Sequence, residues 1–218
     1  QDYVGDTFNH SGTLNLTWQI DSKNKANFYW LMTRRNLLND SSATQTPESS
    51  SYLYSNPDYI AQASWTNPVT SKFLLEGGFT FANETWWWVQ RGYGDNQPKS
   101  YGILDGYDIL NVTNAPPEWI QKYELSNSTL YGANFVNERA FSHQYNFRFA
   151  ANYVTGTHSI KVGMQDMFGT RQFTYDQNNS QYWIFSNGAP LGLYQYAWPL
   201  ADTEHLKAGL GIYAQDKW

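Results

Sequence analysis

Residues 145–167 read YNFRFAANYVTGTHSIKVGMQDM, and this stretch decides the fold. In its first half Tyr145, Phe147 and Phe149 alternate with polar residues, so the aromatic rings share one face of an extended chain. After a short turn at Gly156, the alternation of apolar with polar or small residues resumes. The stretch therefore predicts a β-hairpin with one apolar and one polar face.

A two-faced hairpin fits two kinds of protein. It can cover the core of a soluble β-sandwich with its polar face in water, or it can line a membrane barrel with its polar face toward an aqueous lumen. The lengths of the connections distinguish the two, because an outer-membrane barrel has short turns at one rim and long loops at the other.

The same alternation recurs along the chain and predicts seven strands. They cover residues 12–20, 26–33, 59–66, 73–83, 144–154, 159–168 and 205–215. The connections between them alternate between short and long without exception. The long ones, which we expect on the exterior, are residues 34–58, 84–142 and 169–204.

This order predicts an all-β chain, an antiparallel up-and-down segment of a transmembrane β-barrel that occupies residues 1–218 as one partial barrel domain. A structureless loop as long as residues 84–142 is also uncommon in a compact soluble domain. Single-chain bacterial barrels have an even number of strands, and an open sheet edge cannot face lipid. We therefore expect the seven strands to be part of a larger barrel.

Composition narrows the classes of function. Aromatic residues make up 18% of the chain, more than one soluble core needs, which favours membrane-interface belts or stacking platforms for a ligand. The net charge of -5 comes without a basic run, so nothing indicates nucleic-acid binding. There is no cysteine, which excludes disulfides, thiolate metal sites and a cysteine nucleophile.

Three runs carry a resemblance to a known family: QASWTNPVTSKFLLEGG at residues 62–78, GTHSIKVG at 156–163 and LGIYAQDKW at 210–218. In sequence, order and spacing they resemble the barrel of Oar-like TonB-dependent receptors, which often carry a carboxypeptidase-regulatory-like domain. The resemblance implies a barrel of about twenty-two strands, plugged by an N-terminal domain and driven by the inner-membrane TonB machinery, that imports a nutrient. A TonB box, a plug domain and the C-terminal barrel segment of such receptors are not found in these 218 residues.

Aromatic residues in the longest predicted loop form the first candidate site. These are Trp86, Trp87, Trp88, Tyr93 and Trp119. They would make a stacking surface for a carbohydrate or another flat ligand at the outer mouth of the barrel. The simpler interpretation, which we favour, is that they belong to an outer aromatic girdle or pack the loop against itself.

Four charged residues form the second candidate set, because they fall on the polar faces of different strands. They are Glu76, Arg148, Lys161 and Lys207. In a barrel they would face the lumen and pair with one another or with a plug. A solvated or salt-bridged wall is the simpler interpretation, and the pattern favours it over specific substrate binding.

Metal binding and catalysis have little support. Asp95, Asp105 and Asp108 suggest at most a calcium ion in the long loop, without the spacing of an EF-hand. The four histidines show no zinc-ligand spacing, and nucleophile elbows, P-loops and dinucleotide fingerprints are absent from the sequence. We expect no cofactor, no metal and no enzymatic activity.

The favoured interpretation is a receptor and transporter barrel in the bacterial outer membrane. Its expected partners are outer-membrane lipid, the TonB machinery acting through a plug domain, and a small-molecule, glycan or peptide substrate. One alternative is a soluble or surface-exposed β-sandwich that binds carbohydrate, which would bury the row from Tyr145 to Phe149 against a second sheet. Another is a structural subunit that pairs with other chains through open sheet edges.

Overall fold

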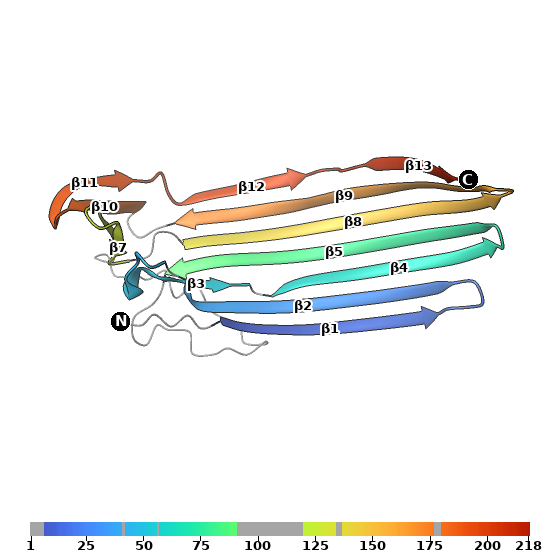
Figure 1. Ribbon diagram of the computed structural model, residues 1–218, viewed down its shortest axis with the longest axis horizontal. Coiled ribbons are helices and arrows are strands. Elements are labelled where there is room, and N and C mark those ends of the chain that lie inside the picture. The colour runs from blue at the N-terminus through green and yellow to red at the C-terminus, as the bar shows by residue number, and fades with distance from the viewer. Residues whose placement is uncertain (1–6, 41, 56, 91–119, 134–136, 177–179) are drawn as a thin grey trace.

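The hairpin around Gly156 is part of a long antiparallel sheet (Figure 1). Its strands, β8 (Asn137–Thr155) and β9 (His158–Asp176), have 19 residues each and pair along their whole length. The computed structural model describes residues 7–40, 42–55, 57–90, 120–133, 137–176 and 180–218.

Nine strands form this large sheet. Besides β8 and β9 they are β1 (Thr7–Gln19), β2 (Lys25–Asp40), β3 (Ser51–Tyr54), β4 (Asp58–Thr70), β5 (Phe73–Gln90), β12 (Leu200–Leu206) and β13 (Gly211–Lys217). Their order is β1-β2-β3-β5-β8-β9-β12, with β4 also between β2 and β5 and β13 also beside β9. The strands β3 and β4 follow one another in the same position of the sheet, between β2 and β5, and β12 and β13 do so beside β9. If each such position is called a lane, the nine strands occupy seven lanes. Every neighbouring pair is antiparallel, which confirms the predicted fold class, and the sheet is open.

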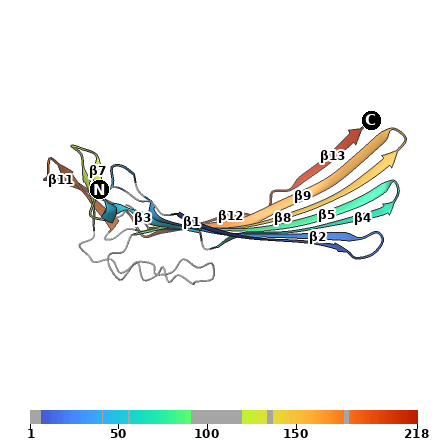
Figure 2. The same cartoon turned by 60° about the horizontal axis from the view of Figure 1, so that its bottom comes forward.

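The two ends of the sheet differ. At one end, which we call the short-turn end, residues 20–24, 71–72 and 156–157 join successive strands. The opposite end, the loop end, carries all the longer connections (Figure 1). The sheet is strongly curved, and β9 and β13 bend away from the plane of β2 toward the short-turn end (Figure 2). Curvature and asymmetric ends are the geometry of a barrel wall.

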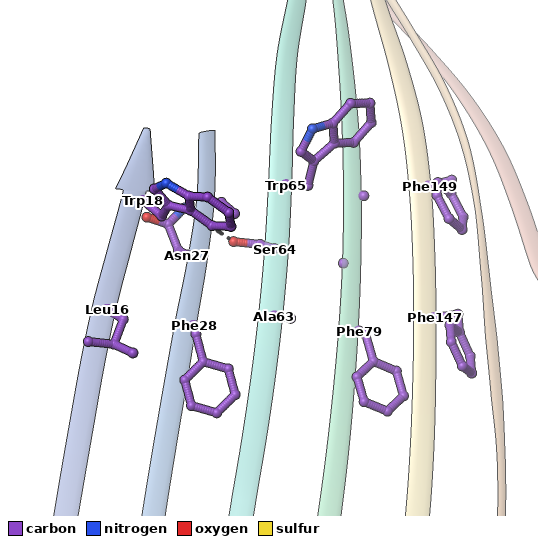
Figure 3. Close-up of a pocket in the computed structure, with 13 residues that line it drawn as sticks. Leu16, Trp18, Asn27, Phe28, Ala63, Ser64, Trp65, Phe79, Phe147 and Phe149 are labelled. Carbon is purple, nitrogen blue, oxygen red and sulfur yellow. Dashed lines mark hydrogen bonds between the residues drawn. The ribbon is translucent and has the colours of Figure 1, made fainter. Parts of the chain in front are cut away.

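One face of the sheet, the apolar face, is built from continuous cross-strand rows, since residues directly opposite each other in paired strands share a face. One row contains Leu16, Phe28, Ala63, Phe79 and Phe147 (Figure 3). On β5 the apolar residues run from Phe73 to Phe81, about 27 Å along a strand. A usual strand tilt reduces this to a height of roughly 20 Å, close to the apolar band of membrane barrels. Farther along, the same face becomes polar at Asn83 and Thr85.

Within the described residues no second sheet covers the apolar rows of this face, although its polar end is buried at Arg34, Asn36 and Thr85. Phe149 remains 56% exposed and Ile212 79% exposed, whereas the buried hydrophobic residues, among those whose side chains the structure describes, are Leu53, Ile120 and Ala133. A sandwich would have buried Phe147 and Phe149 under another sheet. The alternative of a soluble sandwich, stated from the sequence, is therefore wrong.

The opposite face, the polar face, carries hydroxyl, amide and charged side chains. One row contains Asn15, Tyr29, Gln62, Thr80 and Asn146. Neighbours on this face bond to one another, as when Thr17 donates to Asn27 at 3.0 Å. The polar face thus satisfies its side chains in water and across strands, as a lumen wall does.

Where two lanes are interrupted, side-chain oxygens accept the hydrogen bonds that backbone carbonyls accept elsewhere in the sheet. Between β3 and β4, the Thr85 N–H donates to Asp58 Oδ1 at 2.7 Å, and the Arg35 N–H donates to Ser55 Oγ at 2.8 Å. Between β12 and β13, the Gly209 N–H donates to Asp166 Oδ1 at 3.1 Å. These bonds pair backbone N–H groups that the interrupted strands leave without a carbonyl partner.

The strands extend beyond their predicted bounds toward the loop end. β5 continues to Gln90 instead of ending at residue 83, β8 begins at Asn137 instead of 144, and β9 ends at Asp176 instead of 168. The apolar alternation stops where the apolar face ends, although the backbone ladder continues, so the sequence pattern missed these segments. The strand predicted at 205–215 is split into β12 and β13, with residues 207–210 between them.

The regions predicted as irregular loops contain further structure. A second sheet has the order β11-β10-β6-β7, and its strands are β6 (Gln121–Glu124), β7 (Thr129–Tyr131), β10 (Gln181–Ser186) and β11 (Ala189–Gln195). A short 3-10 helix, η1 (Pro47–Ser49), lies next to β7. We call this four-stranded unit the outer sheet; it lies beyond the loop end (Figure 1).

Candidate functional site: aromatic rings at the loop end of the polar face

An ion pair on the polar face joins β5 to β9 across the intervening β8. Lys161 Nζ lies 2.8 Å from Glu76 Oε2, and Asn152 Nδ2 donates to the same oxygen at 2.7 Å. Both charged side chains are about one third exposed, 36% for Lys161 and 35% for Glu76. The pair is a water-accessible wall contact, which contributes little to stability.

Arg148 lies on the same face, where its side chain crosses Gly78. A Cβ atom added at Gly78 would collide with the Arg148 Nε atom, so glycine is what allows the side chain to lie flat. Arg148 has no salt bridge to any residue in the described ranges. It borders a hollow of about 230 Å³ together with Thr80, Asn146 and Gln165. Its guanidinium is available to groups that enter the lumen.

Lys207, the fourth residue of the predicted charged set, is not on a strand. It lies in the interruption between β12 and β13. Glu76, Arg148 and Lys161 lie on the polar face as the period of two predicts, whereas the interruption breaks the alternation on which the prediction for Lys207 depended.

The three consecutive tryptophans belong to β5 rather than to a loop, and the strand divides them between its faces. Trp86 and Trp88 share the polar face, with ring centroids 5.2 Å apart and planes 83° apart. Trp87 points to the other face, where its ring centroid lies 5.4 Å from that of Phe141. The strand thus brings Trp86 and Trp88 together and places Trp87 on the opposite face. Tyr93, Trp119 and the predicted calcium ligands Asp95, Asp105 and Asp108 lie outside the described residues.

Trp86 and Trp88 lie on the same face of the sheet as further aromatic rings. Across the sheet, Trp86 is in one row with Ala140 and Phe173, and Trp88 is in one row with Glu138 and Tyr175. Two rows of the wall thus present rings from β5 and β9 on the polar face at the loop end.

From β9 the rings continue into the outer sheet. Successive centroid distances are 5.4 Å for Phe173–Tyr175, 6.4 Å for Tyr175–Trp198, 4.1 Å for Trp198–Tyr196, 5.9 Å for Tyr196–Tyr182 and 4.9 Å for Tyr182–Tyr194. We call these six residues the aromatic track. The separations are those of interacting ring pairs, so the track is a continuous surface from the wall to the outer sheet.

Local sequence builds the outer half of the track. Tyr194, Tyr196 and Trp198 have a spacing of two, which places them on one side of an extended chain. Tyr182 is directly opposite Tyr194 in the β10–β11 pair, so its ring joins them. The Ser180 hydroxyl donates to the Trp198 carbonyl oxygen at 3.1 Å and fixes the end of this segment.

The β10–β11 hairpin that carries two of these tyrosines was missed in the sequence, although its turn had a recognisable signal. Asn187 and Gly188 both have positive φ, 52° and 77°. An Asn-Gly pair suits a two-residue turn in which both residues must adopt that conformation. The pair lies in a stretch rich in Asn, Gln and Gly, whose composition also predicts an irregular loop.

A carboxylate fixes the outer sheet. Glu124 is 9% exposed and accepts hydrogen bonds from the Ser126 hydroxyl at 2.6 Å and from the N–H groups of Asn187 and Gly188 at 2.8 and 2.9 Å. The Ser126 hydroxyl, then the Ser126 and Gly188 backbone N–H groups, lower the pKa of Glu124 to about 2. Glu124 therefore holds the β10–β11 turn against β6 as an anion at neutral pH.

Polar groups border the aromatic track where it meets the wall. The Tyr175 hydroxyl donates to Glu138 Oε1 at 3.3 Å. The Arg171 guanidinium lies 5.5 Å from the centre of the Phe173 ring and 3.9 Å from Glu204 Oε2. Rings with carboxylates and a guanidinium at their edges can stack a flat apolar surface and bond the hydroxyls of a ligand at the same time.

The described ranges contain no group of three or more His, Asp or Glu side chains placed to hold a metal ion. No helix in those ranges has the length and apolar character needed to cross a membrane.

Comparison with known proteins gives one match. The model of a family described as an outer membrane beta barrel domain matches residues 3–218. No curated protein and no solved structure matches the chain significantly.

Proposed function

Since the chain belongs to the outer membrane beta barrel domain family, we propose that it forms part of the wall of a TonB-dependent receptor that imports a nutrient. The family places the protein in the bacterial outer membrane. The single observation that carries the transport proposal is the aromatic track, because it leads from an outer structure onto the polar face of the wall. A merely structural wall has no need of such a path.

The orientation follows from the two ends of the sheet. Outer-membrane barrels place short turns in the periplasm and long loops outside, so the outer sheet would face the exterior. The apolar face would contact lipid. At the short-turn end the Trp65 indole N–H donates to Asn24 Oδ1 at 2.9 Å. An apolar ring with a bonded polar edge suits the membrane boundary.

In the proposed mechanism the exterior segments capture the substrate, and the aromatic track guides it to the polar face. The plug rearrangement driven by the inner-membrane proton gradient comes from the resemblance to Oar-like receptors. A plug would meet the polar face, where Arg148 and the Glu76–Lys161 pair offer it charged contacts. No step forms or breaks a covalent bond, so we propose that the protein is not an enzyme.

A growth experiment tests this function. A deletion strain of the source bacterium and a complemented strain are compared on panels of single oligosaccharides, peptides and iron chelates. We expect the deletion to abolish growth on at least one source, and dissipation of the proton gradient to abolish uptake of that source by the complemented strain. Equal growth on every source, or uptake that persists without the gradient, would contradict the proposal.

A further inference from the structure

We propose that the aromatic track is a binding site for a neutral oligosaccharide. This inference rests on the proposed function in that the loop end of the polar face receives the substrate. The track consists of six rings from one strand of the wall, one connection and two strands of the outer sheet. So long a series of rings exceeds what a single-ring ligand contacts, and it suits a chain of sugar rings whose apolar faces stack on aromatic side chains.

The outer end of the track is accessible. Tyr194 is 55% exposed, although its ring stacks on Tyr182 with planes 17° apart. A cluster that served only to pack the outer sheet would hide its terminal ring. The exposed ring gives a ligand a place to start on the track.

The polar groups beside the inner end favour a neutral ligand. Glu138, Asp202 and Glu204 lie on the same rows as Phe173, Tyr175 and Arg171, on the polar face. Carboxylates accept hydrogen bonds from sugar hydroxyls and repel anionic groups. The three carboxylates would repel an acidic glycan. Arg171 is the cation among them, and its guanidinium already lies beside Glu204.

One row of the wall beyond the track offers uncharged hydrogen-bonding groups. Gln62, Thr80 and Asn146 form a row of amides and a hydroxyl on the polar face, and Gln62 Nε2 lies 3.4 Å from Thr80 Oγ1. Uncharged donors and acceptors exchange hydrogen bonds with a polyhydroxylated ligand at little electrostatic cost. Aromatic rings outside and amides farther in are a suitable sequence of contacts for a neutral sugar chain.

The test is calorimetric binding to the full-length protein purified in detergent. The probes are maltoheptaose, cellohexaose and mannohexaose, with hexagalacturonate as the anionic comparison. We expect one neutral probe to bind and hexagalacturonate to bind more weakly. Tyr194→Ala should weaken binding about fivefold to tenfold, since it removes one stacking ring, and Tyr194→Phe should recover most of the loss.

Trp183→Ala is the matched control, because Trp183 neighbours Tyr182 in β10 but points to the opposite face. It should bind the neutral probe like the wild type. Heat-modifiable migration of each variant confirms that its barrel is folded. Tyr194 is a safe position for this purpose, since its side chain is largely exposed.

Three results would overturn the inference: no binding of any neutral oligosaccharide, equal binding by Tyr194→Ala, or tighter binding of hexagalacturonate. The assay needs neither TonB nor a proton gradient. Energised uptake without oligosaccharide binding would therefore refute only the substrate class, whereas oligosaccharide binding without energised uptake would refute only the transport function.

Discussion

The indole ring of Trp198 stacks on the phenol ring of Tyr175, with centroids 6.4 Å apart and planes 18° apart. Tyr175 belongs to β9 in the wall, whereas Trp198 lies in the connection from β11 to β12. This pair is where the aromatic track passes from the outer sheet to the wall. It links the part of the protein that would meet a substrate first with the face along which the substrate would pass.

Removal of this ring should loosen the outer sheet and leave the wall intact. We expect Trp198→Ala to be cleaved several times faster by chymotrypsin within residues 181–199, because the stacking contacts with both Tyr175 and Tyr196 are lost. Limited digestion followed by mass spectrometry measures the rates. Unchanged cleavage, with Trp183→Ala as the control, would show that the stacked pair does not hold the outer sheet.

The outer sheet should also loosen in acid because of Glu124. Its pKa, about 2 in the folded protein, lies below the ordinary value of 4.5, so its contribution to stability is complete above about pH 4.5 and is lost as the pH falls toward 2. Chymotrypsin is inactive in that range, so pepsin cleavage between pH 4 and pH 2 reports the change. Glu124→Gln should be loosened already at pH 4 and vary less with pH. A wild-type profile as flat as that of Glu124→Gln would contradict this role.

Gly163 tests how closely the strands of the wall pack. A Cβ atom there would lie 2.8 Å from the Phe149 carbonyl oxygen and 2.5 Å from the Tyr213 ring. We expect Gly163→Ala to lower the free energy of unfolding by about 1–3 kcal/mol, as overpacking does. Urea unfolding of the refolded barrel in detergent measures it. Gly192→Ala is the control, since a Cβ atom at Gly192 meets nothing within 4 Å; equal stability of the two variants would refute the packing argument.

The Glu76–Lys161 pair should matter little for stability despite its short distance of 2.8 Å. Because both side chains are partly in water, Glu76→Gln should change the free energy of unfolding by less than about 1 kcal/mol. The same urea assay applies. A loss of several kcal/mol would mean that the polar face is shielded from water rather than solvated.

Much of the wall was predictable from the sequence, and the reason is physical. Where a strand has lipid on one side and water on the other, its side chains must alternate, as Tyr145, Phe147 and Phe149 do. This requirement determines both faces of the hairpin around Gly156 and the placement of Glu76 and Lys161 on the polar one.

The alternation of apolar and polar side chains ends where the apolar face of the strand ends. Beyond Phe81 the face that carries Phe79 and Phe81 becomes polar at Asn83 and Thr85, while the ladder continues to Gln90. The period of two therefore gives no sign that the tryptophans that follow belong to the same strand. The aromatic track could not be predicted as a unit from the sequence. Its two ends, Phe173 and Tyr194, are connected only through the pairing of β10 with β11 and the packing of Trp198 on β9.

The orientation of the two faces is the central claim, and single cysteines can test it directly because the chain contains none. We would place a fluorophore in turn at Phe147, Phe149, Asn146 and Thr80 of the full-length protein in bilayers, and measure quenching by brominated lipid and by aqueous iodide. The account predicts lipid quenching at Phe147 and Phe149 and iodide quenching at Asn146 and Thr80. Equal quenching by lipid at neighbouring positions, or the reverse pattern, would contradict it.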